Sequence, residues 1–109
     1  MKPTPAPRHL RPDTAQFWDQ TVEDYDLAPH HIKLLTLVCD AWDSHEAARE
    51  AIAADGAYLP ARDGGKRAHP AVAVMRDSRI AVARLLRELN LEDSPGDSRP
   101  ARISGRYAS

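Results

Sequence analysis

The glycine-rich stretch GGK at residues 64–66 is the first segment whose residue types could do chemistry, because glycine-rich loops that end in lysine cradle phosphates. Such a loop also needs an earlier glycine and a Ser or Thr directly after the lysine. Here Arg67 follows the lysine, and the earlier glycine is missing. The sequence therefore disfavours a nucleotide site, and we expect no cofactor.

A second group of side chains is of the metal-ligating kind: His30, His31, Asp43, His45 and Glu46. Adjacent histidines on a helix project about 100° apart and cannot easily share a metal, and Asp43, His45 and Glu46 do not converge. His45 lies inside the apolar arc of its helix, where a hydrogen bond between helices or subunits is favoured over catalysis. We expect no metal and no catalytic residue.

Cations in the second half of the chain suggest phosphate binding instead. The candidate DNA-binding residues are Arg62, Lys66, Arg67, Arg76 and Arg79. Only Asp63 and Asp77 lie among them to neutralise their charge. Two alternatives remain open. Arginines are good helix formers whose stems cover apolar surface, so a solvated face or salt bridges to acidic helices would also suit them. The segment around Lys66 could equally be a flap that packs on a neighbouring subunit.

The distribution of charge along the chain supports a binding function. The net charge is +3 over residues 1–12, −8 over residues 13–56, +4 over residues 57–91 and zero over residues 92–109. An acidic first half and a basic second half favour nucleic-acid binding or self-association over small-molecule catalysis. A surface dipole without function is the alternative. Acidic and basic surfaces on one subunit would suit head-to-tail packing into a ring.

Three amphipathic helices and one hairpin should position these charges, which makes the fold class mainly α. We expect the first helix over residues 14–26 with Asp13 as its cap, the second over residues 29–55 with Gly56 at its end, and the third over residues 71–91. The second helix carries an apolar arc of about 160°, which is wide for a surface helix and predicts more than one neighbour. Cys39 sits beside that arc as a small core residue.

A short β-hairpin is predicted between the second and third helices, at about residues 57–69. Asp63-Gly64 favours a tight turn because both positions can take positive φ, and Pro60 favours short edge strands. Residues 13–91 thus form a helical oligomerisation and DNA-binding core. We expect residues 1–12, with four prolines, to be a flexible basic arm, and residues 92–109 to be a flexible tail.

Length and composition limit the class of protein. The chain has 109 residues, enough for one core, and its aromatic content of 6% argues against a large β-sandwich. With Cys39 as the only cysteine, no intramolecular disulfide is possible, which fits a reducing compartment. No stretch approaches the ~20 apolar residues of a membrane span, and residues 1–12 lack a signal-peptide core. We expect a soluble intracellular protein with no membrane partner.

The order of these features resembles the small terminase subunits of tailed phages, over about residues 13–106. It comprises a tryptophan-bearing first helix, a long helix ending in EAAREAIAADG, a DGG hairpin, the run AHPAVAVMRDSR, a leucine-rich helix and an SRPAR tail. The chain departs from the family in NLEDSPGDSRPAR, where an acidic spacer precedes the arginines, so the roles of Arg99 and Arg102 stay open.

The resemblance implies a specific function. Small terminase subunits are not enzymes: they bind double-stranded viral DNA, assemble as homo-oligomeric rings, and load and regulate the large terminase subunit, which holds the ATPase and nuclease, in the host cytoplasm. The alternative is a helical protein-interaction module or regulator that binds no DNA. The sequence contains no helix-turn-helix spacing or zinc ligands that would indicate a preferred DNA sequence.

Overall fold

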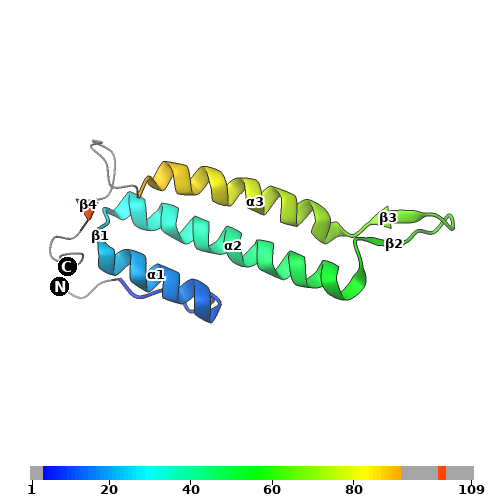
Figure 1. Cartoon of the computed structure of the whole chain (residues 1–109), viewed down its shortest axis with the longest axis horizontal. Coiled ribbons are helices and arrows are strands. Elements are labelled where there is room, and N and C mark those ends of the chain that lie inside the picture. Colours follow the sequence, from blue (N-terminus) through cyan, green and yellow to red (C-terminus); the bar gives the residue numbers. More distant parts are fainter. Residues whose placement is uncertain (1–3, 92–100, 103–109) are drawn as a thin grey trace, which may run out of the picture.

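Two long helices form the body of the protein. The computed structural model describes residues 4–91 and the backbone of residues 101 and 102. In it, α2 (Pro29–Asp55) and α3 (Pro70–Leu89) lie antiparallel along most of their length, joined by the hairpin β2–β3 (Figure 1). Each begins with a proline, which suits the first helical turn because that turn leaves its N–H groups unpaired anyway. The predicted helices and hairpin are confirmed, with the third helix running over residues 70–89.

Regular spacing of buried residues explains why α2 and α3 pack along their length. Four of the buried residues on α2 are separated by four, three and seven residues, as in a coiled coil: His31, Leu35, Val38 and His45. On α3 the buried positions are Ala71, Ser78 and Leu89. The result is a rod with extents of 61 × 27 × 27 Å and a radius of gyration of 17.8 Å. A compact domain of this length would have a radius of gyration of about 13 Å.

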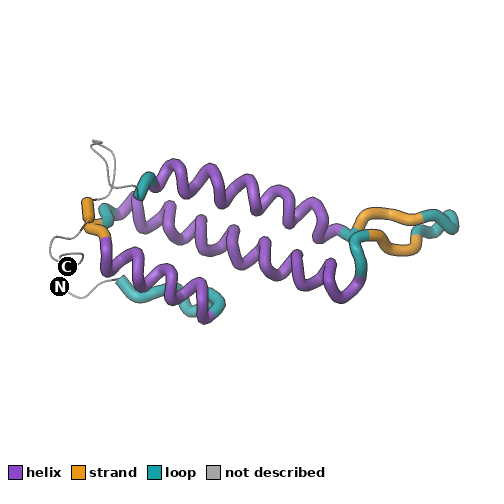
Figure 2. The backbone as a smooth tube through the Cα atoms, viewed as in Figure 1, coloured by secondary structure: helices purple, strands orange, loops and turns teal. Residues whose placement is uncertain are grey.

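The first helix, α1 (Pro12–Asp24), lies beside one half of α2 only (Figure 2). Two details of its prediction are wrong. Asp13 is not the cap, since the helix starts two residues earlier than predicted, after Arg11, and the Asp13 Oδ1 accepts from the neighbouring Thr14 N–H at 3.1 Å. The helix also ends at Asp24, because the next two residues form strand β1 (Tyr25–Asp26) and pair antiparallel with β4 (Ala101–Arg102).

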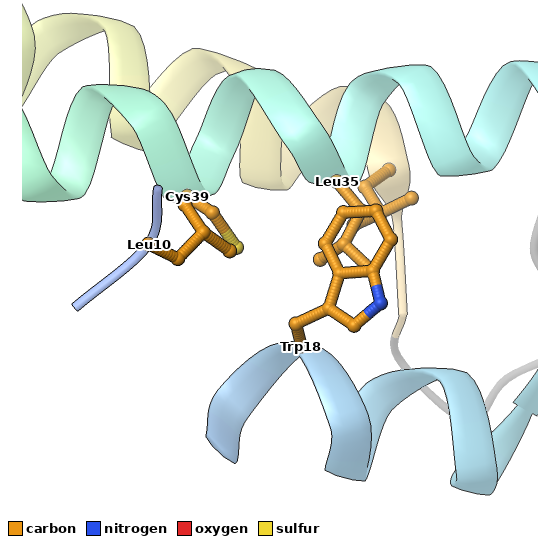
Figure 3. Close-up of a cluster of buried hydrophobic side chains, with 5 residues drawn as sticks. Leu10, Trp18, Leu35 and Cys39 are labelled. Carbon is orange, nitrogen blue, oxygen red and sulfur yellow. The ribbon is translucent and has the colours of Figure 1, made fainter. Parts of the chain in front are cut away.

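The core lies where α1 covers α2. The indole of Trp18 points from α1 to Leu35 of α2, while Leu10 and Cys39 lie further along the same seam (Figure 3). Leu89 of α3 completes the cluster, and Trp18, Leu35, Cys39 and Leu89 are each at most 1% exposed. Cys39 is thus a core residue, as predicted. Burial, with Asp43 and Asp40 nearby, raises the pKa of its thiol to about 12.

Residues 4–11 pack along α2 and α1, whereas the sequence predicted a flexible arm over residues 1–12. The carbonyl of Thr4 accepts from Trp18 Nε1 at 3.3 Å, and Arg11 makes two bonds of 2.9 and 3.0 Å to the Glu50 carboxylate. His9 pairs with Asp40 at 2.6 Å. Acidic residues of α2 therefore have cationic partners within the chain. Residues 1–3, and the predicted flexible tail apart from β4, lie outside the described residues.

The hairpin formed by β2 (Tyr58–Pro60) and β3 (Lys66–Ala68) projects beyond the ends of α2 and α3 (Figure 1). Its turn differs from the predicted one. Ala61 N–H donates to the Gly65 carbonyl at 2.9 Å and Gly64 N–H to the Ala61 carbonyl at 3.1 Å, which encloses a three-residue loop. Among the three residues of this hairpin loop, Gly64 alone has positive φ, at 86°. This loop needs a left-handed residue at its last position alone, so Asp63 keeps negative φ.

Candidate nucleic-acid interface

The hairpin presents three of the predicted DNA-contacting cations to solvent. Arg62 lies in the three-residue loop, and Lys66 and Arg67 begin β3; all three are exposed. The Asp63 carboxylate, the acid nearest in sequence, is engaged locally, because its Oδ1 accepts from Gly65 N–H at 2.9 Å. The tip therefore combines exposed cations with a backbone fixed by its own hydrogen bonds.

The pairing register separates Lys66 and Arg67 onto opposite faces of the two-stranded ribbon. Leu59 pairs with Arg67 and Pro60 with Lys66, and side chains of directly paired residues share a face. One face carries Lys66 with the 67% exposed Tyr58, and the other carries Arg67 with the half-buried Leu59. The sequence placed both cations near the tip but did not reveal that they point apart.

The other two candidates, Arg76 and Arg79, are exposed residues of α3. Arg79 lies about 14 Å along the helix from its first residue at a rise of 1.5 Å per residue. The Arg76 Nε donates to Asp77 Oδ1 at 3.2 Å, and both side chains are well exposed. Arg76 and Arg79 therefore add two exposed cations in the half of α3 that adjoins the hairpin.

Arg79 also contacts the buried His45, which sits at the α2–α3 seam. Arg79 Nη2 lies 3.4 Å from His45 Nε2, and Nδ1 of the same ring lies 2.9 Å from Glu46 Oε2. Since arginine can only donate, Nε2 accepts and Nδ1 carries the proton. The predicted hydrogen bond between helices is thus confirmed. Bonds from Arg49 and His45 hold the pKa of Glu46 below its usual value.

His69 is a positioning residue that sequence reasoning missed. Its Nδ1 accepts from Ala71 N–H at 3.0 Å as the N-cap of α3, its Nε2 lies 2.9 Å from Asp55 Oδ2 at the end of α2, and its backbone N–H donates to the Ala57 carbonyl at 2.8 Å. The His69 side chain thus links the two helix ends, and its backbone N–H links them to the base of the hairpin. The His-Pro sequence was the available signal, since a polar residue before a first-turn proline is a cap pattern.

Neither a metal centre nor a membrane span is found in the described residues. Within residues 4–91 and 101–102, no three His, Cys, Asp or Glu side chains come together in a group able to hold a metal. His30 and His31 place their ring centroids 4.0 Å apart, with a tilt of 42° between the rings. None of the described helices combines the length and apolar character needed to cross a membrane.

Comparison with known proteins gives the class and then the family. The fold is an elongated helical one, with a projecting hairpin that carries exposed cations. The family model described as phage terminase, small subunit, matches residues 15–95, which is most of the chain. The chain therefore belongs to the phage terminase small subunit family and has a role in phage genome packaging. No curated protein and no solved structure gives a significant match.

Proposed function

We propose that this protein binds double-stranded viral DNA and assembles as a ring of identical copies, which loads and regulates the large terminase subunit in the host cytoplasm. It acts without catalysis or cofactor of its own. The family match supports the packaging role. The observation that carries the DNA-binding part is the hairpin, where three exposed cations stand on an element that projects away from the core.

The chemistry of the hairpin favours contact with DNA phosphates over base recognition. Cations that contact phosphates release condensed counterions, so binding weakens steeply as salt rises and depends little on DNA sequence. Lys66 and Arg67 point to opposite faces, and a ribbon of this kind can touch phosphates on two sides of a groove. In a ring the cluster repeats once per subunit, and this repetition turns weak contacts into avidity.

Charge reversal of the hairpin tests the DNA-binding part. The variant Lys66→Glu with Arg67→Glu should bind duplex DNA more weakly for every sequence, and the salt slope should flatten by about 1 for each phosphate that the protein no longer neutralises. The matched control is Arg8→Glu with Lys33→Glu, which changes the net charge equally at two exposed positions away from the hairpin. Fluorescence anisotropy at several salt concentrations separates the two variants.

Unchanged DNA affinity and salt slope in the hairpin variant, with assembly intact, would remove the hairpin from the DNA site. The outcome would then favour the runner-up function, in which the hairpin contacts a neighbouring subunit or the large subunit. Single reversals at Lys66 and at Arg67 would show which face of the ribbon the DNA meets.

Assembly is tested by mass. The protein is an elongated rod, and its radius of gyration exceeds that of a compact domain by several ångströms. Each of its three helices leaves at least one large apolar side chain exposed. This exposed apolar surface supports a homo-oligomer. Sizing with light scattering should give several times 12.1 kDa, and high salt should loosen the assembly if the acidic half supplies part of the contact. A monomer at micromolar concentration would overturn the ring.

A further inference from the structure

A cavity of about 340 Å³ opens where the three helices meet. Its lining includes one large apolar side chain from each helix: Phe17 of α1, Trp42 of α2 and Leu86 of α3. All three are about two-fifths exposed, at 43%, 42% and 39%. Its volume is many times the about 30 Å³ that one water takes up, so it has room for a side chain. We call it the three-helix cavity.

The three-helix cavity is unfavourable when left open to water. Apolar surface costs about 25 cal/mol for each Å² that water contacts, and contiguous exposed apolar surface usually marks a contact site. Neither the hairpin nor the candidate DNA-binding residues line this cavity. The ligand or side chain that fills the cavity must therefore be inferred from the chemistry of the residues that line it.

The charge beside the cavity restricts what can enter. Asp13 is one of the lining residues, and α1, which forms this wall, belongs to a stretch of the chain, residues 12–32, that contains five acidic residues and no Lys or Arg. An apolar side chain flanked by cations would pack against the apolar lining of the cavity and pair with the carboxylate at its edge. A side chain flanked by carboxylates would be repelled.

The chain itself carries such a side chain. Outside the cavity, the described residues include four other exposed large hydrophobics: Leu37, Tyr58, Val74 and Ile80. Tyr58 stands on the hairpin. Of the three on helices, Ile80 alone has an arginine both four residues before it and four residues after it, namely Arg76 and Arg84. Asp77, three residues before Ile80, pairs with Arg76, so two cations stand against one acid at these positions. Leu37 has one cation and one acid at neighbouring helical positions, and Val74 has no cation there.

We infer that the three-helix cavity receives Ile80 of a second copy, with Arg84 of that copy beside Asp13. This deepens the proposed ring by naming its two contact surfaces, and it rests on that proposal. Ile80 and Leu86 are six residues apart and therefore point about 120° apart around α3. One subunit can thus fill a neighbour's cavity while another neighbour fills its own, which is the condition for a head-to-tail contact that closes into a ring.

A mixing experiment tests this contact. Phe17→Glu places a charge at the cavity, and Ile80→Glu places one on the inserted side chain, so each variant alone should be monomeric by light scattering. Mixed in equal amounts, they should form a dimer of twice 12.1 kDa and nothing larger, because each mixture contains one intact cavity and one intact Ile80 surface per pair. Leu37→Glu is the matched control, as it charges an equally exposed side chain outside both surfaces and should leave the assembly intact.

A second pair of variants guards against misfolding. Asp13→Arg and Arg84→Asp should each weaken assembly, and their combination should restore it. If the wild type assembles and both glutamate variants assemble equally well, this inference fails while the ring stands. A mixture that stays monomeric, with both variants folded by circular dichroism, also overturns it. A monomeric wild type overturns the ring itself, and DNA binding by the hairpin can still be measured separately.

Discussion

The two ends of the rod are built in opposite ways. At the end covered by α1, Trp18, Leu35 and Leu89 are almost completely buried. At the hairpin end, every residue from Pro60 to Ala68 except Ala61 is exposed. A two-stranded hairpin is marginal in water without packing, so its geometry depends on local hydrogen bonds. Folding stability and the proposed DNA contact are therefore separated along the molecule, and we expect a substitution to affect mainly one of them.

Replacement of Trp18 by alanine should have the largest effect and sharpen this comparison. Removing a buried aromatic side chain costs about 3–5 kcal/mol of unfolding free energy, a large share of the 5–15 kcal/mol typical of a domain. Tyr58→Ala, at 67% exposure, should stay within about 0.5 kcal/mol. Urea denaturation followed by circular dichroism measures both. Equal destabilisation in the two variants would show that the hairpin end shares the core.

Replacement of His69 by alanine comes next, because it removes the cap of α3 and the link to Asp55 together. The loss of a helix cap costs about 0.5–2 kcal/mol. We expect the hairpin amides to exchange faster with solvent while the amides around Trp18 keep their protection. The matched control is His9→Ala, which removes an exposed histidine–carboxylate pair near the middle of α2. Faster exchange throughout the chain in the His69 variant would contradict a local role.

Gly64 offers a perturbation that is confined to the hairpin. A Cβ at this position would meet no atom within 4 Å, so Gly64→Ala should cost only the backbone strain of a left-handed residue, about 1–2 kcal/mol within the hairpin. Gly64→Asn should cost less, because asparagine adopts this conformation more readily. Hydrogen exchange at residues 58–68 reports the difference. If alanine and asparagine behave alike, the positive φ is not what the turn requires.

Sequence reasoning succeeded where the signal was local. Apolar periodicity and the positions of proline and glycine were enough to predict three helices and a hairpin at residues 57–69. Sequence reasoning failed to predict the contacts between segments that are far apart in the chain. Nothing local predicts that β1 pairs with β4, some 76 residues later, or that Leu10 joins the core. The candidate cations could be named, but the divergence of Lys66 and Arg67 depends on strand register, and the three-helix cavity depends on how α1 lies across the rod.

Acid should weaken the contact of the N-terminal residues 4–11 with α2, with the smallest expected effect. The hydrogen bonds from Arg11 hold the pKa of Glu50 below its usual value of 4.5. A carboxylate whose pKa is lower in the folded state contributes stability that is fully present above its unfolded pKa and is lost as pH falls through the folded pKa. Wild type and Glu50→Gln should therefore differ in urea midpoint at pH 7 and converge as the pH falls through the lowered pKa of Glu50, below which both carry an uncharged side chain opposite Arg11. Because this ion pair is exposed, the difference in urea midpoint at pH 7 should be small.

A difference in urea midpoint that persists unchanged in acid would mean that Glu50 acts through packing. Residues 4–11 would then be held mainly by Leu10 and by the hydrogen bond between Thr4 and Trp18.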